Sequence, residues 1–146
     1  MRSLGRILML AACVGAWAQP AFAGRIVVAN DEWTLSNTGF SNTFFGSLDF
    51  AQNVGAFFAG GGTGSFLVVS DNFGLDGDLA TSLALFMTGA GHAWVDSEDV
   101  PGFTLDLPTL QNYDGVFFAL PPAVDQSVLT NYVNAGGNVF IEGGTG

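Results

Sequence analysis

Three observations predict that this sequence folds as an α/β domain with a doubly wound, mostly parallel sheet. Short apolar, β-branched runs alternate along the chain with segments of helical periodicity. The strongest runs, residues 65–70 and 115–120, are apolar without alternation, which is typical of parallel strands covered on both faces. Glycine- or proline-rich turns punctuate the pattern. Strands that alternate with helices form parallel sheets through right-handed crossovers.

The first half of the chain is predicted to hold two strands and one helix. Residues 25–29 form a short β-branched strand, and the Asn-, Ser-, Thr- and Gly-rich residues 30–42 form a loop. From residue 45 to 58, apolar side chains recur at spacings of three and four, which indicates an amphipathic helix. Gly60–Gly62 end this helix, and residues 65–70 form the second strand.

The next unit is predicted to begin with a turn-rich loop over residues 71–77. Asp76 or Asp78 can cap the helix that follows, whose apolar stripe runs over residues 79–87. Gly89–Gly91 stop that helix. Residues 92–96 form the third strand.

The last unit follows a polar, irregular stretch over residues 96–108. Residues 115–120 form the fourth strand, residues 124–133 a helix that Ala135–Gly137 end, and residues 138–142 the fifth strand. The glycine-rich turn that follows usually leads into another helix. We therefore expect a C-terminally truncated domain, lacking further sheet elements and any sorting segment.

The N-terminus is predicted to be a signal peptide over residues 1–23, followed by a single α/β domain over residues 24–146. Arg2 and Arg6 form a basic segment before a short apolar run, and Ala21-Phe22-Ala23 is an A-x-A cleavage site. The apolar run is too short to span a bilayer, so no transmembrane segment is expected. A rival reading makes Leu10-Ala11-Ala12-Cys13 a lipobox, in which case Cys13 would be lipidated.

Charge and cysteine content exclude several classes of function. Beyond residue 23, Arg25 is the only basic residue, whereas all 13 acidic residues remain. Such a surface repels nucleic acid and anionic lipid. Cys13 is the only cysteine, so the exported domain has no disulfide, thiolate metal site or cysteine nucleophile. No cofactor is predicted, and export machinery and signal peptidase are the expected partners during secretion.

Candidate ligand-binding residues follow the first and last strands, where doubly wound sheets bind ligands. Asp31, Glu32 and Trp33 combine two carboxylates with an indole that could stack a sugar ring, although the three could equally close a loop. The turn at Gly143, Gly144 and Thr145 could present backbone N–H groups to a ligand, but it lacks phosphate-loop spacing.

Two acidic groups are weaker metal candidates. Asp71, Asp76 and Asp78 supply oxygen ligands of the kind Ca²⁺ prefers, without the spacing of a known calcium loop, and turn formation and capping explain them equally. A second acidic patch covers residues 96–99. His92 is the only histidine, and we expect it to cap or pack at the entry of a strand rather than act as a base.

The residues at 30–40, 113–118 and 132–140, the last reading Tyr-Val-Asn-Ala-Gly-Gly-Asn-Val-Phe, resemble a group of exported PEP-CTERM bacterial proteins. In that group a C-terminal tag directs exosortase sorting to the cell surface or extracellular matrix. The resemblance implies a secreted or cell-surface protein that contacts polysaccharide or a surface protein. The tag itself is absent from this sequence.

The second half also resembles class I glutamine amidotransferase-like domains, which implies a flavodoxin-like fold. The shared features are a Tyr-Asp strand, a helix ending in Tyr-Val-x-x-Gly-Gly, and a strand leading into a sharp turn. In the active enzymes the turn carries a nucleophilic cysteine, whereas here that position falls on Gly144, or on Thr145 in a shifted register. We expect a non-catalytic exported protein. The alternative is a secreted amidotransferase-like or hydrolase-like enzyme completed by residues beyond this sequence.

Overall fold

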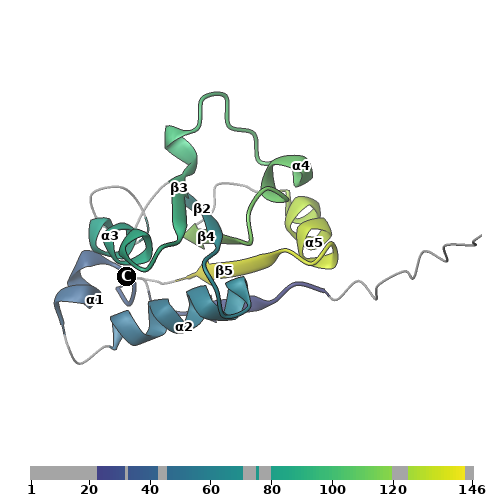
Figure 1. Cartoon of the computed structure of the whole chain (residues 1–146). Helices are drawn as coiled ribbons and strands as arrows, with labels where there is room; N and C mark the ends of the chain where they lie inside the picture. The colour runs from purple at the N-terminus through teal and green to yellow at the C-terminus, as the bar shows by residue number, and fades with distance from the viewer. Residues whose placement is uncertain are drawn as a thin grey trace, which may run out of the picture.

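A parallel five-stranded sheet forms the centre of the molecule in the computed structural model (Figure 1). The structure describes residues 23–31, 33–42, 46–70, 75, 80–119 and 125–143. All four strand pairings are parallel, which confirms the predicted doubly wound α/β fold. The strands are β1 (Ile26–Ala29), β2 (Ser65–Ser70), β3 (Ala93–Asp96), β4 (Gly115–Ala119) and β5 (Asn138–Glu142).

The strands lie in the order β1-β5-β4-β2-β3. From β2 the chain first moves outward to β3 and then returns to the other side of β2 to form β4. The strand order therefore reverses between β2 and β4. If β2 is counted as the first strand, then β3, β4 and β5 become the second, third and fourth. The order then matches the 2-1-3-4-5 arrangement of flavodoxin-like sheets, with β1 in the place of the fifth strand.

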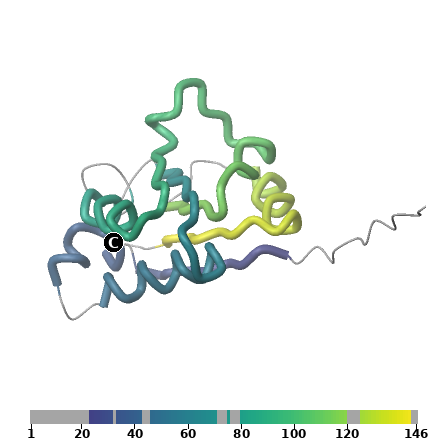
Figure 2. Tube along the Cα trace, in the orientation of Figure 1, coloured from purple at the N-terminus to yellow at the C-terminus, as the bar shows by residue number. Residues whose placement is uncertain are grey.

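Helices cover both faces of the sheet (Figures 1 and 2). One face carries α1 (Asn37–Ser41), α2 (Ser47–Ala59) and α3 (Thr81–Gly89), and the other carries α4 (Leu107–Leu110) and α5 (Gln126–Asn134). The buried side chains accordingly form two clusters, one on each side of the sheet. Residues 97–106 project away from the sheet between β3 and α4 (Figure 2).

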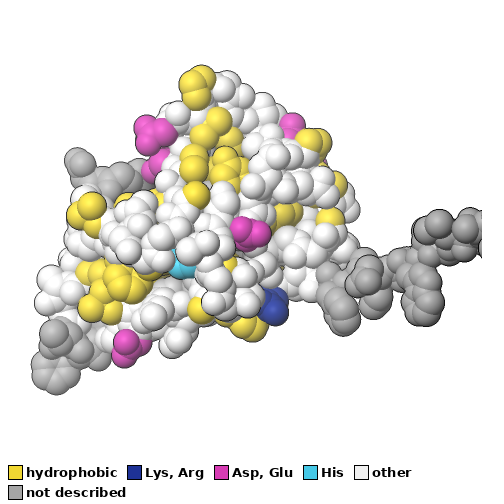
Figure 3. All heavy atoms as spheres, in the orientation of Figure 1, with side chains coloured by type: hydrophobic (Ala, Val, Ile, Leu, Met, Phe, Trp, Pro, Cys, Tyr) yellow, Lys and Arg dark blue, Asp and Glu magenta, His cyan; other side chains and the backbone are white. Residues whose placement is uncertain are grey.

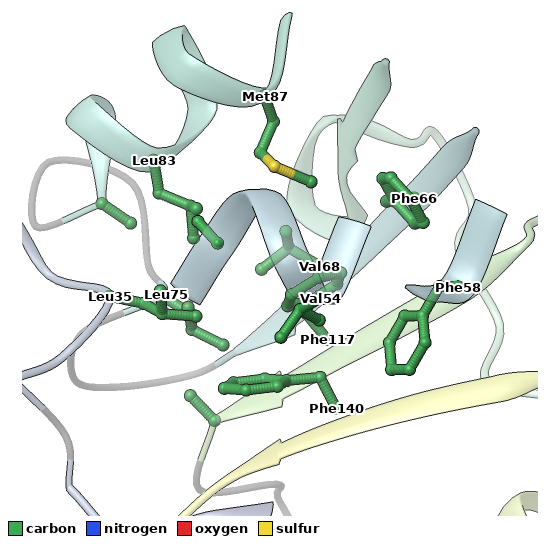
Figure 4. Close-up of a cluster of buried hydrophobic side chains, with 13 residues drawn as sticks. Leu35, Val54, Phe58, Phe66, Val68, Leu75, Leu83, Met87, Phe117 and Phe140 are labelled. Carbon is green, nitrogen blue, oxygen red and sulfur yellow. The ribbon is translucent and has the colours of Figure 1, made fainter. Parts of the chain in front are cut away.

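Aromatic packing centres on Phe117 of β4, on the α2–α3 face (Figure 4). Its ring centroid lies 5.7 Å from that of Phe66 and 5.1 Å from that of Phe140. Trp94 of the edge strand lies 4.9 Å from Phe117, and Phe58 of α2 lies 5.9 Å from it. Each such pair contributes about 0.5–1.5 kcal/mol beyond area burial. This network joins α2 to four of the five strands.

Three short helical turns lie in segments that the sequence pattern predicts to be irregular. The side chains of Ser36, Asp96 and Asp106 accept backbone N–H groups at the starts of α1, the 3₁₀ turn η2 (Ser97–Asp99) and α4. The hydrogen bonds from Thr109 hold the pKa of Asp106 below its usual range. Single turns have no apolar periodicity long enough to recognise, and these caps are what stabilise them.

The helix α3 begins at Thr81, two residues after the predicted start. Its N-cap residue Ala80 provides no side-chain hydrogen bond, and Asn37 of α1 accepts the Ser82 N–H at 2.8 Å instead. Asp76 and Asp78, either of which could cap this helix according to the sequence, lie outside the described residues. At the end of α2, Gly60 adopts φ 69°, as expected for a glycine that stops a helix.

Candidate functional site

Four strand ends lie side by side at the carboxyl edge of the sheet. Ser70 of β2 pairs with Ala119 of β4, Ala119 with Glu142 of β5, and Glu142 with Ala29 of β1. Residues paired in parallel register share a face, and here Ala119 belongs to the α2–α3 cluster. This row therefore places a hydroxyl and a carboxylate on the face covered by α1, α2 and α3.

Glu142 is the side chain that the sequence pattern does not single out as a candidate. Only 2% of its surface is exposed, and Ser70 is 3% exposed. The backbones of these two residues lie about 10 Å apart, because one strand separates them. The signal in the sequence was an acidic residue ending the apolar run Asn-Val-Phe-Ile-Glu, since carboxylates are seldom buried without a structural or functional reason.

The loop after β1 is held together by Asp31. Its carboxylate accepts the Trp33 N–H at 2.9 Å and the Thr34 hydroxyl at 3.0 Å. The Ser36 hydroxyl then donates to the Trp33 carbonyl at 2.8 Å. Asp31 thus closes the loop, one of the two roles predicted for it. Trp33 is 51% exposed, and Glu32 lies outside the described residues.

Gly143 continues the pairing of β1 with β5. Its N–H donates to the Ala29 carbonyl at 2.8 Å, so the chain leaves β5 beside the loop that contains Asp31. The structure therefore places Gly143, the first residue of one predicted ligand segment, at the same corner of the sheet as the loop that contains Asp31. Gly144 and Thr145 lie outside the described residues, and their proposed role stays a prediction.

A pocket of about 340 Å³ opens between α3 and the edge strand β3. The outward face of α3 forms one side, because Leu83 and Met87 turn the opposite face into the core. The polar and aromatic side chains that line the pocket come from α3, β3 and η2. They are Thr81, Thr88, Trp94, Asp96 and Asp99. The exposed Leu85 also lines the pocket.

Indole, hydroxyl and carboxylate groups meet in this pocket. Trp94 is half-buried, with its ring against Phe117, so its position is fixed by the core. Asp96 accepts the Glu98 N–H at 3.0 Å, which orients its carboxylate. Asp99 is exposed. An ordered aromatic surface beside a few oriented polar groups is the usual composition of a small-molecule site.

The structure describes only one of the two acidic groups that the sequence offers as metal candidates, the patch over residues 96–99. Asp71, Asp76 and Asp78 lie outside the described residues, so the calcium hypothesis stays untested there. Among the residues that the structure does describe, no three His, Cys, Asp or Glu side chains gather as a metal ion would require. Figure 3 shows acidic side chains at separate places on the visible face.

His92 lies at the amino end of β3, opposite the carboxyl edge. Its Nδ1 accepts the Gly64 N–H at 2.9 Å, and its ring centroid lies 5.1 Å from that of Phe66. Since Nδ1 accepts a hydrogen bond here, the imidazole carries its proton on Nε2. The histidine therefore ties the start of β2 to the start of β3.

Comparison with known proteins yields no match among family models, curated proteins or solved structures. Within the described ranges, none of the helices has the length and apolar character needed to cross a membrane. The candidate site must therefore be interpreted from its own chemistry.

Proposed function

We propose that this chain is an exported, non-catalytic binding domain that attaches to polysaccharide at the cell surface or in the extracellular matrix. The observation that carries the proposal is the pocket between α3 and β3, where Trp94 lies beside Asp96 and Asp99. A sugar ring has apolar faces that suit an indole and hydroxyl groups that suit carboxylate acceptors. The acidic chain favours neutral or basic glycans over anionic ones.

The tryptophan content allows a direct binding assay. Beyond residue 23 the only tryptophans are Trp33 and Trp94, so Trp33→Phe leaves the pocket residue as the sole indole. Titrating this variant with neutral oligosaccharides should change the emission of Trp94. If the emission stays constant while the wild-type protein binds the same glycan, the binding site lies at the Trp33 loop instead.

Charge in the pocket provides the matched test. Asp99→Asn should weaken binding about tenfold, because a hydrogen bond to a charged acceptor contributes about 1.5–3 kcal/mol. Asp49→Asn makes the same substitution on an exposed residue of α2 outside the pocket, and affinity should stay unchanged. Equal affinities for all three proteins would refute a pocket-bound glycan.

Export is tested separately by sequencing the N-terminus of secreted material. We expect Gly24 as the first residue, and a lipidated Cys13 would support the lipoprotein reading instead. Proposed exosortase sorting is tested on the open reading frame of the parent protein. A Pro-Glu-Pro tag followed by an apolar helix and arginines would support it.

The second candidate function is an amidotransferase-like or hydrolase-like enzyme. Buried Glu142, directly before the Gly143 turn, favours this candidate because a carboxylate there could take a proton from a nucleophile. Against it, the apex residue in the natural register is Gly144, which has no nucleophilic side chain. We expect no glutamine hydrolysis by the full-length protein. Hydrolysis that Thr145→Ala abolishes in a folded variant would establish the enzyme.

A further inference from the structure

The backbone nitrogen of Gly24 lies at the C-terminal end of α5. It donates to the Val133 carbonyl at 2.6 Å, and the same carbonyl accepts the Gly136 N–H at 3.0 Å. The last carbonyls of a helix carry the negative end of its dipole and have no partners within the helix. This end of α5 therefore suits a positively charged donor.

The surrounding backbone leaves room only for glycine at position 24. A Cβ there would lie 1.6 Å from the Gly137 carbonyl oxygen, so the backbone would have to move to admit one. Immediately afterwards, the Arg25 N–H donates to the Asn138 side chain at 3.0 Å, and Arg25 accepts the Val139 N–H at 2.8 Å. The chain is thus fixed from Gly24 onward, whereas Ala23 before it is exposed.

We propose that the end of α5 is a binding site for the new amino terminus that signal-peptide removal creates at Gly24. The inference rests on the proposed cleavage after Ala23. Water hydrolyses the Ala23–Gly24 peptide bond, Ala23 leaves with the carboxylate, and the Gly24 nitrogen takes a proton to become an ammonium group. The atom that donates to Val133 then carries a positive charge, and charge-assisted hydrogen bonds are roughly twice as strong as neutral ones.

The neighbouring charged groups leave this interaction intact at neutral pH. The Arg25 guanidinium lies over the Phe57 ring and donates to the Phe57 carbonyl. Tyr132 packs under Gly137, and burial, followed by the charge of Asp114, raises its pKa to about 12, so it is uncharged. The acidic residue that faces Tyr132 is Asp114, whose carboxylate accepts the Ser65 N–H at 2.8 Å.

The pH dependence follows from the charge. An α-amino group titrates near pH 8 in an unfolded chain, and an acceptor that binds the ammonium raises this pKa in the folded protein. The stabilisation is therefore complete below about pH 8 and is lost as pH rises through the higher folded value.

The experiment compares two forms of residues 24–146, one with a free Gly24 amino group and one acetylated there. Acetylation keeps an N–H donor and removes the charge, as the uncleaved chain does. We expect the free form to melt about 2–5 °C higher at pH 6–7, with the gap closing above about pH 9. A protein retaining Ala23, whose ammonium is one residue away, should behave like the acetylated form.

Identical melting temperatures for the free and acetylated forms between pH 6 and pH 10 would overturn the inference. Because the comparison uses purified protein with defined termini, it does not depend on where the cell cleaves. Sequencing of secreted material tests the cleavage itself. The two failures are therefore distinguishable.

Discussion

The ring of Tyr132 lies directly against the backbone of Gly137, so that a Cβ on the glycine would come within 2.2 Å of the ring atom Cε2. Tyr132 is buried, and its hydroxyl donates to the Tyr113 carbonyl at 2.9 Å. The ring therefore cannot swing aside without losing that bond. This contact joins α5 to the start of β5 and to the turn before β4, and it accounts for the Tyr-Val-x-x-Gly-Gly pattern in physical terms.

Gly137→Ala should destabilise the protein by about 1–3 kcal/mol, the usual range for overpacking a fixed core. Urea denaturation followed by circular dichroism measures the change. Gly62→Ala is the matched control, because a Cβ at Gly62 meets no atom within 4 Å. A Gly137→Ala variant as stable as this control would show that the ring moves freely.

Tyr132→Phe should remove part of the decrease in stability that the wild-type protein shows at alkaline pH. Burial raises the pKa of Tyr132 to about 12, against about 10 when unfolded, with the charge of Asp114 as the second cause. The native state therefore holds this proton more tightly, and stability falls as pH rises from 10 to 12. The variant should lose less stability over that interval, as measured by urea midpoints at each pH. Parallel curves for both proteins would contradict the assignment.

Loss of the imidazole at position 92 should weaken the fold and leave glycan binding unaltered. In His92→Ala the Gly64 N–H loses its acceptor and Phe66 loses a ring contact, at a cost of about 1–3 kcal/mol. Thermal melting and oligosaccharide titration of the same sample measure the two properties. A stable variant that no longer binds glycan would instead make His92 part of the site.

The sequence predicts the strands and the three long helices well because both depend on local apolar patterns. The position of β1 beside β5 could not be predicted, since Val139 and Arg25 are joined by a backbone hydrogen bond across most of the chain. The α3–β3 pocket was missed for the same reason: Thr81, Trp94 and Asp99 belong to three separate elements. The burial of Glu142 likewise depends on strands far away in the sequence.

The hydrogen bond between Asn37 of α1 and Ser82 of α3 gives the last prediction. Asn37 accepts the Ser82 N–H, so it replaces the cap that Ala80 cannot provide and holds the first turn of α3, where Thr81 lines the pocket. Asn37→Ala should destabilise the protein by about 1 kcal/mol, the usual cost of a lost cap. It should also speed amide exchange at Ser82 and weaken oligosaccharide binding, because the pocket wall loosens. Asn53→Ala, on the exposed surface of α2, provides the control and should change none of these. Slow exchange at Ser82 in Asn37→Ala would mean that another group caps α3. The hydrogen bond to Asn37 would then have no influence on the pocket.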